Sequence, residues 1–238
     1  MTEKITLGDM VVDVMFKDIK NIHLSVHPPT GNVRISAPLK MDIDTIRVYA
    51  ISRLSWIKTH QRKLREQDRE TPREYLERES HYVWGERYLL RVKTHSAPPM
   101  VMLSPRHMDV SVRPGSGPDK IERVLAAWYR EQVRGVAKKL ITKWEPVMGV
   151  NVSKVFVQRM KTRWGSCTPD TRSIRLNTEL AKKPRECLEY IVVHEMVHLL
   201  ESTHNARFVA LMDQWLPDWR ELRKRLNRAP LSHAEWTY

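Results

Sequence analysis

The spacing of apolar residues predicts strands at the start of the chain and a helix directly after them. Apolar and polar residues alternate over residues 5–37, and turn residues at 28–32 predict a hairpin within this region. From residue 42 to about 69 the apolar residues recur at helical spacing, and Asp42 or Asp44 can cap the start of that helix. Its other face is rich in Lys and Arg, which is typical of a solvated surface but also suits contact with a phosphate backbone.

The middle of the chain repeats this order of strands followed by a helix. A charged stretch at 70–81 predicts a linker, and strand patterns follow at 82–92 and 108–112. Pro and Gly residues at 114–118 form the clearest break in the chain. A long helix is expected from about 119 to 145, because its apolar residues fall on one broad side.

The last third of the chain predicts short strands and helices around a basic loop at 159–167. Strands are expected at 154–158 and 173–177, and the second of them could offer an edge along which an extended peptide pairs. Helices follow, one with Pro184 near its first turn, then one at 205–216 and one from 219 onward.

Composition indicates a globular protein with a strong positive charge. The chain has 238 residues, of which 41% are hydrophobic, enough for one good core or two small ones. A net charge of +13 favours polyanionic partners such as nucleic acid or nucleotides. The two cysteines, Cys167 and Cys187, provide no disulfide framework and indicate a reducing compartment. Because no signal-peptide core or membrane-spanning run is found, we expect a cytoplasmic protein without a membrane partner.

The strongest chemical signal is the pattern H-E-x-x-H at residues 194–198. On a helix, His194 and His198 project from the same face one turn apart, so that two imidazoles can reach one metal ion. Glu195 remains free to act on a bound water. The surrounding residues are apolar, so the helix is expected to be buried, and a metal would satisfy its polar side chains.

A third histidine, His204, can complete this site only if the helix ends before it. Six residues of unbroken helix would turn His204 by roughly 600° relative to His198, onto the side away from the metal. The helix is therefore expected to end within 199–203. Glu221 is the available alternative as third ligand, but three histidines with an open fourth position make a catalytic zinc site.

The basic loop before the second strand has two possible roles. Gly165 would permit an unusual backbone angle, and Trp164 could pack against the core, which are structural roles. Arg159, Lys161 and Arg163 could instead meet a negatively charged substrate or transition state. Cys167 has no acid or base partner placed by the sequence and is expected in the core rather than at a metal.

These residues together resemble a known family. The run from Arg163 to Cys167 (R-W-G-S-C), the H-E-x-x-H helix, His204 and Phe208 resemble the bacterial YgjP-like, DUF45-type metal-dependent hydrolases, which are close to the SprT-like and WLM zincin metallopeptidases. The resemblance is strongest over about 150–228. It implies a zincin-like catalytic domain in which His194, His198 and His204 bind zinc and Glu195 is the general base and acid.

The chain departs from the neighbouring metzincins at two points. The spacing to His204 equals theirs, but Glu201 stands where they have a glycine, and no methionine-turn segment is found. The expected fold class is α+β, with a β-rich N-terminal region with long helices followed by the zincin-like catalytic domain. The expected domains are 1–115, with an amphipathic helix, 116–228, the metallohydrolase, and a tail at 229–238.

Three functions are compatible with these residues. The first is a zinc metallopeptidase acting on protein or peptide, with Glu195 as general base and Arg163 helping zinc to stabilise the oxyanion. The second, which the family resemblance implies, is a nucleoside triphosphate (UTP) pyrophosphatase, in which the basic loop would bind phosphates and Mg2+ or Mn2+ would be the working ion. The third is a nucleic-acid-binding module with a structural zinc, against which the intact Glu195 and only three ligands argue.

Overall fold

A computed structural model describes residues 2–27, 31–66, 74–75, 77–160 and 163–228. The chain divides into two compact units, the first comprising the described residues up to 66 and the second those from 74 onward. The expected boundary between residues 115 and 116 lies inside the second unit and does not coincide with the division between the units. The assignment of separate functions to 1–115 and 116–228 stays a prediction. The expected tail at 229–238 lies outside the described residues.

The first unit is built on a four-stranded sheet in the order β1-β2-β4-β3. Its strands are β1 (Thr2–Leu7), β2 (Met10–Lys17), β3 (His23–His27) and β4 (Asn32–Pro38). The expected hairpin is confirmed, because β3 and β4 pair antiparallel, with Val26 opposite Val33. The parallel pairing of β2 with β4 places their buried valines and isoleucines on one face.

Two helices cover this sheet where one was expected. The helices are α1 (Ile43–Ser52) and α2 (Leu54–Glu66), and the chain breaks between them at Arg53 (φ −105°, ψ 4°). The Arg53 N–H bonds to the Ala50 carbonyl, only three residues back, so the last turn tightens and the single helix prediction is wrong. Asp42 does cap α1, as expected, by accepting from the Thr45 N–H at 2.8 Å.

The second unit begins with a sheet in the order β5-β6-β8-β7. Its strands are β5 (Ser80–Val83), β6 (Glu86–Thr94), β7 (Met100–Leu103) and β8 (His107–Val112). The strand pattern expected at 82–92 is confirmed, but it is divided between β5 and β6, because Trp84 and Gly85 form a turn with φ angles of 51° and 87° that reverses the chain. The strand expected at 108–112 is confirmed as β8.

The long helix is confirmed as α3 (Pro118–Met148), which starts with Pro118 and ends before Gly149 in the left-handed conformation (φ 65°). Every fourth residue along much of one face is buried, as a straight helix against a core requires. These buried residues are Ile121, Leu125, Tyr129, Val133, Ala137 and Ile141.

A three-stranded sheet follows in the order β10-β11-β9. Its strands are β9 (Lys154–Gln158), β10 (Gly165–Thr168) and β11 (Ser173–Asn177). The end of the expected basic loop is therefore a strand, because residues 165–168 pair antiparallel with β11. The edge predicted at β11 is also wrong, since β11 lies between its two neighbours and β10 is an edge strand instead.

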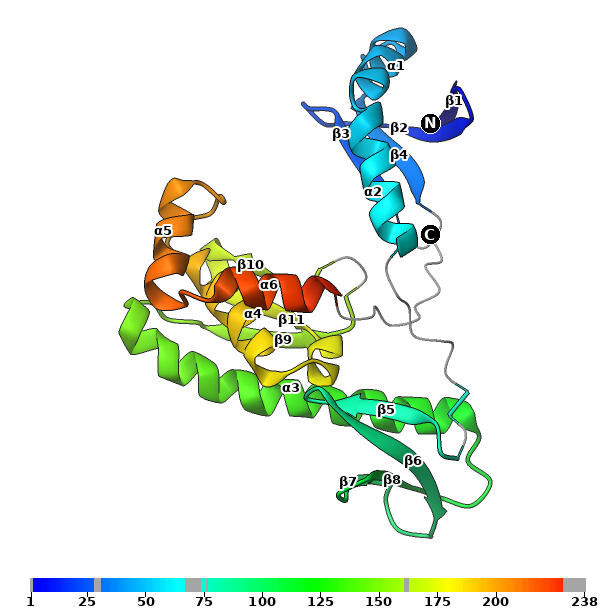
Figure 1. The fold of residues 1–238 in the computed structure, drawn as a ribbon, viewed down its shortest axis with the longest axis vertical. Helices are drawn as coiled ribbons and strands as arrows, with labels where there is room; N and C mark the ends of the chain where they lie inside the picture. The colour runs from blue at the N-terminus through cyan, green and yellow to red at the C-terminus, as the bar shows by residue number, and fades with distance from the viewer. Residues whose placement is uncertain (1, 28–30, 67–73, 76, 161–162, 229–238) are drawn as a thin grey trace. The chain divides into compact units, whose positions relative to one another are not determined.

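Three helices complete the second unit: α4 (Arg185–Val197), α5 (Ala206–Trp215) and α6 (Trp219–Arg228). They share one hydrophobic core with α3 and with both sheets of this unit. The described chain is thus a mixed α+β protein with six helices and three small mixed sheets (Figure 1). Within the described residues, none of the helices is both long and apolar enough to cross a bilayer.

Candidate metal centre

The site is organised by α4, a helix buried on most sides. Its apolar residues fill the core around the two histidines and the glutamate, and Leu188, Val192, Val193 and Met196 are fully buried. The helix ends at Val197, and the next N–H groups bond to carbonyls three or four residues back. The predicted end before His204 is confirmed, two residues earlier than expected. The chain can therefore turn back toward α4.

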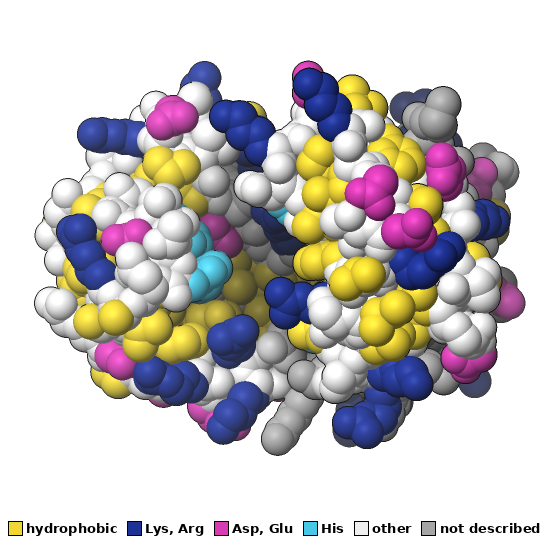
Figure 2. Space-filling view, turned by 90° about the horizontal axis from the view of Figure 1, so that it is seen from above, with side chains coloured by type: hydrophobic (Ala, Val, Ile, Leu, Met, Phe, Trp, Pro, Cys, Tyr) yellow, Lys and Arg dark blue, Asp and Glu magenta, His cyan; other side chains and the backbone are white. Residues whose placement is uncertain are grey.

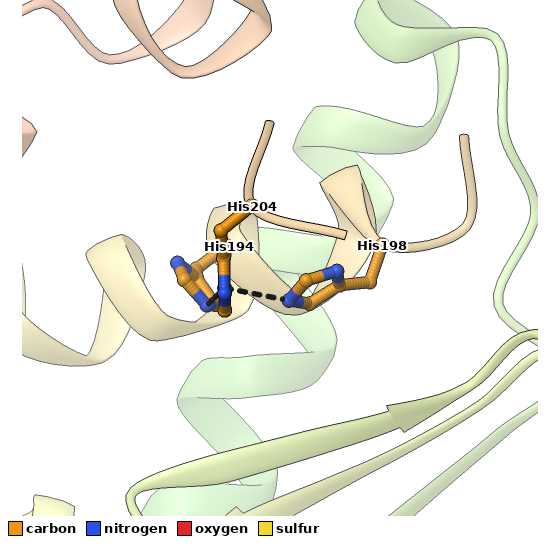
Figure 3. A group of neighbouring side chains, drawn as sticks. All are labelled: His194, His198 and His204. Atoms are coloured by element: carbon orange, nitrogen blue, oxygen red, sulfur yellow. Dashed lines mark hydrogen bonds between the residues drawn. The ribbon is translucent and has the colours of Figure 1, made fainter. Parts of the chain in front are cut away.

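This turn brings three imidazole rings together (Figure 3). The Nε2 atom of His204 lies 3.1 Å from Nε2 of His194 and 3.1 Å from Nε2 of His198. Figure 3 shows all three rings directing a nitrogen toward the same point, two from α4 and its end and one from the segment that follows. Ligand atoms converging within 4.8 Å are the arrangement that a single metal ion needs.

The turn between the second and third histidines is held by its own polar groups. His198 Nδ1 lies 3.0 Å from the Glu201 carbonyl oxygen and must donate to it, which leaves Nε2 with a free lone pair. The Glu201 carboxylate accepts from the Thr203 N–H and hydroxyl. Asn205 then caps α5 by accepting from the Phe208 N–H at 3.0 Å. Glu201, which replaces the metzincin glycine, thus builds the turn.

Phe208 forms the floor of the histidine cluster. Its ring centroid lies 5.0 Å from that of His194, 4.8 Å from that of His198 and 4.6 Å from that of His204. The Phe208 side chain is itself buried, so it fixes the three rings against the core. His204 forms the open side of the cluster, since it is exposed, and Figure 2 shows histidine side chains reaching the surface.

Electrostatics keep the two helix histidines in their neutral form. Burial, with smaller contributions from His198 and His204, lowers the pKa of His194 to about 3. Burial also lowers the pKa of His198, despite the opposing hydrogen bond to Glu201. Neutral imidazole is the form that binds metal, so the donor set fits a zinc ion at neutral pH.

Glu195 lies beside this cluster and is shielded from water. Only 5% of the residue is exposed, and burial raises the pKa of its carboxyl to about 8, while the positive charge of Arg163 acts in the opposite direction. A carboxyl whose pKa is raised by burial is suited to exchange a proton near neutral pH. Burial and the Glu195 charge also raise the pKa of the Cys167 thiol to about 11, so this cysteine is a neutral neighbour.

Gly165 allows β10 to approach Glu195 closely. A Cβ at this position would lie 2.6 Å from Glu195 Oε1 and 2.9 Å from a methyl carbon of Ile191. The sequence suggested that this glycine serves an unusual backbone angle, but its φ is not in the left-handed range. Its role is steric, and no pattern within the loop could have revealed a contact with a helix about thirty residues away.

The other predicted site residues fall into different places. Arg163 has an exposed side chain, and its charge partly opposes the burial that raises the pKa of Glu195. Arg159 instead lies 4.0 Å from Glu122, and Lys161 is outside the described residues. Glu221, the alternative third ligand, is exposed and lies 3.5 Å from Lys224. Among the described residues, the ligand cluster consists of the three histidines.

Asn177 is a residue near the site that sequence reasoning treated only as the end of a strand. It is 5% exposed, and its side-chain amide donates to the main-chain carbonyls of Met160 and Arg163, both within the basic loop. The signal in the sequence is an asparagine at the end of an apolar strand. If that residue is buried, its amide must find hydrogen-bond partners. The identity of those partners depends on the tertiary fold.

Comparison with solved structures finds partial similarity to several chains, among them two metallopeptidase zymogens. One is the metallopeptidase zymogen abylysin from Pyrococcus abyssi, with 20% identity, a TM-score of 0.36, and coverage of 38% of this chain and 90% of that one. The other is the metallopeptidase zymogen jannalysin from Methanocaldococcus jannaschii, with 21% identity, a TM-score of 0.34, and coverage of 38% and 92%. No curated protein matches the chain.

The family comparison covers far more of the chain. The family model described as YgjP-like, metallopeptidase domain, matches residues 20–229. This range includes β3 and β4 of the first unit and the whole described second unit, with the histidine cluster and Glu195. The chain belongs to the YgjP-like metallopeptidase family.

Proposed function

We propose that this protein is a zinc metallopeptidase whose metal is held by His194, His198 and His204. The observation that carries the proposal is the convergence of three histidine Nε2 atoms beside a buried carboxyl. Three neutral imidazoles suit Zn2+ better than Mg2+ or Mn2+, which prefer oxygen ligands. When bound, zinc supplies Lewis-acid chemistry, in that it polarises a carbonyl and lowers the pKa of water. We also propose that α4 and the turn after it correspond to the active-site helix of a zincin-like fold.

Glu195 is the proton-transfer group in this proposal. Its carboxylate accepts the proton of the attacking water and then delivers that proton to the leaving amine. Burial supports this role, because a carboxyl whose pKa is raised to about 8 binds a proton more readily than an exposed glutamate. The adjacent Gly165 leaves the carboxyl in direct contact with β10, which fixes its position.

The edge strand β10 is the proposed binding site for the peptide main chain. An edge strand presents main-chain N–H and C=O groups that an extended peptide can pair with. β10 starts at Gly165, in contact with Glu195, so a peptide paired with this strand would pass the carboxyl. Arg163 precedes the strand, and its positive charge is proposed to stabilise the negative oxygen that develops on the attacked carbonyl.

Hydrolysis of nucleoside triphosphates stays the runner-up prediction. It requires the basic loop to bind phosphates, and Arg159 instead lies 4.0 Å from Glu122. A nucleic-acid partner and a cytoplasmic location also stay predictions.

The proposal is tested by comparing the wild type with Glu195→Gln, with zinc content measured in both. Glu186→Gln is the matched control, because Glu186 is an exposed residue in the first turn of the same helix. The substrates are an unfolded protein and a panel of nucleoside triphosphates that includes UTP, the latter also with Mg2+ and Mn2+. We expect proteolysis to fall by more than about 100-fold in Glu195→Gln alone, with zinc retained. Loss of triphosphate hydrolysis instead would establish the runner-up.

A further inference from the structure

We propose that Asn177 is a positioning residue that fixes the main chain at Met160 and Arg163 and thereby keeps the Arg163 charge beside Glu195. The inference rests on the proposed function, in which Arg163 stabilises negative charge on the substrate. It adds a residue that contacts neither substrate nor metal and that acts through the main chain of another residue.

The hydrogen bonds of Asn177 use the full capacity of its amide. Its Nδ2 donates to the carbonyl oxygens of Met160 and Arg163, each at 2.8 Å. Its Oδ1 accepts from the N–H of Glu179 at 3.1 Å and from that of Met160 at 3.4 Å. Two donors and two acceptor positions are all that an asparagine side chain offers. Because Asn177 is 5% exposed, water cannot replace these partners freely.

Asn177 also continues the pairing between β10 and β11 beyond its last residue pair. The ladder ends with Gly165 opposite Leu176, and the Asn177 N–H then donates to the Trp164 carbonyl at 2.9 Å. The side-chain amide binds the next carbonyl back, that of Arg163. The main chain of Arg163 is therefore held in register with the strand whose first residue touches Glu195.

This anchoring matters because the Arg163 side chain is exposed. A long exposed side chain has many rotamers, so its charge acts at a defined place only if its main chain is fixed. Arg163 stands two residues before Gly165, where a Cβ would lie 2.6 Å from Glu195 Oε1, so a fixed main chain at Arg163 holds its side chain near this carboxyl. Release of the Arg163 carbonyl would let the charge move away, while α4 and the histidines stay in place.

Asn177 has a second, purely structural role that the test must separate. Its Oδ1 caps the 3-10 helix η2 (Thr178–Lys182) through the Glu179 N–H. Asn177→Asp retains the acceptor oxygens for this cap and is nearly the same size. It removes both donors and places an acidic group against the carbonyls of Met160 and Arg163. Asn177→Ser also keeps a capping oxygen, but it is too short to reach both carbonyls, and it serves if the first variant does not fold.

The first readout is a double-mutant cycle with Arg163→Ala on peptide hydrolysis by the full-length zinc protein. We expect Arg163→Ala to lower kcat by about 100-fold and Asn177→Asp by about tenfold, with KM changed less than about twofold in each. The double variant should be no slower than Arg163→Ala, because Asn177 acts only through Arg163. If the two effects multiply instead, or if KM rather than kcat changes, the positioning role is wrong.

The second readout needs no substrate and therefore separates this inference from the proposed function. Trypsin cleaves after Lys and Arg, so the rate of cleavage after Arg163 reports how firmly the main chain at Arg163 and Trp164 is held. We expect Asn177→Asp to raise that rate by more than about tenfold, while the matched control Asn151→Asp, at an exposed asparagine after α3, leaves it unchanged. An unchanged rate in Asn177→Asp would overturn the inference, even if the protein proves to be an active peptidase. If the rate rises but wild type cleaves no peptide, the proposed function fails and the anchoring by Asn177 stands.

Discussion

Glu195 and His194 are neighbours on one helix, yet burial moves their pKa values in opposite directions. The pKa of the Glu195 carboxyl rises to about 8 and that of His194 falls to about 3. Both shifts have the same cause, because a buried site disfavours the charged form of each group. At neutral pH the metal-free site therefore carries a mostly protonated glutamic acid and a neutral histidine, which leaves imidazole nitrogen free to bind a cation.

The raised pKa of Glu195 predicts how the stability of the metal-free protein depends on pH. Between about pH 4.5 and pH 8 the unfolded glutamate is ionised while the folded one keeps its proton, so the contribution of Glu195 to the free energy of unfolding falls as pH rises through this range. Glu195→Gln has no such proton and should lose this part of the pH dependence. The lowered pKa of His194 has the opposite effect up to its ordinary value of 6.5, and it does so equally in the wild type and in Glu195→Gln. Urea unfolding at pH 5, 6, 7 and 8 with a chelator present measures the difference. If the free energy of unfolding of Glu195→Gln, relative to that of the wild type, does not grow with pH, the raised pKa of Glu195 is contradicted.

Gly165→Ala tests the contact between β10 and Glu195. Its Cβ would lie 2.6 Å from the carboxylate oxygen, so either the strand or Glu195 must move, at a cost of about 1–3 kcal/mol in stability and a loss of hydrolysis. Gly135→Ala, on the exposed side of α3 with no atom within 4 Å of the new Cβ, should instead stabilise by up to about 1 kcal/mol. Thermal unfolding and activity assays on both variants decide the matter. Equal behaviour of the two variants would show that the close approach is unimportant.

Sequence alone could place the histidines but not their surroundings. The spacing of His194 and His198 follows from helix geometry, and the return of His204 follows from the turn that six residues of helix would impose. The steric role of Gly165 and the anchoring by Asn177 depend on which strands pair and how closely they approach α4. Those are contacts between residues distant in the chain, and apolar spacing carries no information about them.

At the scale of elements, the errors of sequence reasoning lie at places where the chain turns without a strong signal. The helix break at Arg53 has neither glycine nor proline, and apolar spacing continues across it to the buried Ile57. The turn between β5 and β6 places Trp84 at φ 51°, where a large residue is unusual. Tertiary packing overrides local preference in the second case, because the Trp84 N–H donates to the Ala181 carbonyl at 2.7 Å.

This turn also supports the start of the helix that carries the site. A Cβ at Gly85 would lie 3.1 Å from the ring of Pro184, the residue that precedes α4. We expect Gly85→Ala to destabilise the protein by about 1–3 kcal/mol more than Gly115→Ala. Gly115 has a similar positive φ of 78° but no atom within 4 Å, so the difference isolates the packing against Pro184. Urea unfolding of both variants measures it, and equal losses would mean that the φ angle alone accounts for the effect.

At the scale of the whole molecule, the described residues form two separate hydrophobic cores. One lies in the first unit and includes Ile35, and the other lies in the second unit and includes Leu90, together with the residues that surround the histidines. These two cores agree with the expectation from composition of one good core or two small ones. The charged stretch at 70–81, expected to be a linker, begins where the two units divide. The sequence did not show that this division separates two cores, because the strands of β5–β8 resemble those of the first unit in pattern.

Two cores predict two calorimetric transitions, of which zinc raises only one. Binding to the second unit stabilises that unit by about 2.7 kcal/mol when free zinc is 100 times the Kd. Ile35→Ala should lower the zinc-independent transition and Leu90→Ala the zinc-dependent one, because both side chains are fully buried and each loss costs about 2–5 kcal/mol. A single transition, or an Ile35→Ala effect on the zinc-dependent one, would show that the two units unfold together.

The central claim is that three histidines hold the metal, and the most direct measurement is the zinc bound per chain in the wild type, His204→Ala and Glu221→Ala. Metal analysis after dialysis, with affinity from competition by a chromophoric chelator, gives stoichiometry and Kd. We expect one zinc per wild-type chain, an affinity reduced by more than about 100-fold in His204→Ala, and unchanged binding in Glu221→Ala. Tight zinc binding by His204→Ala, together with its loss in Glu221→Ala, would contradict the three-histidine site.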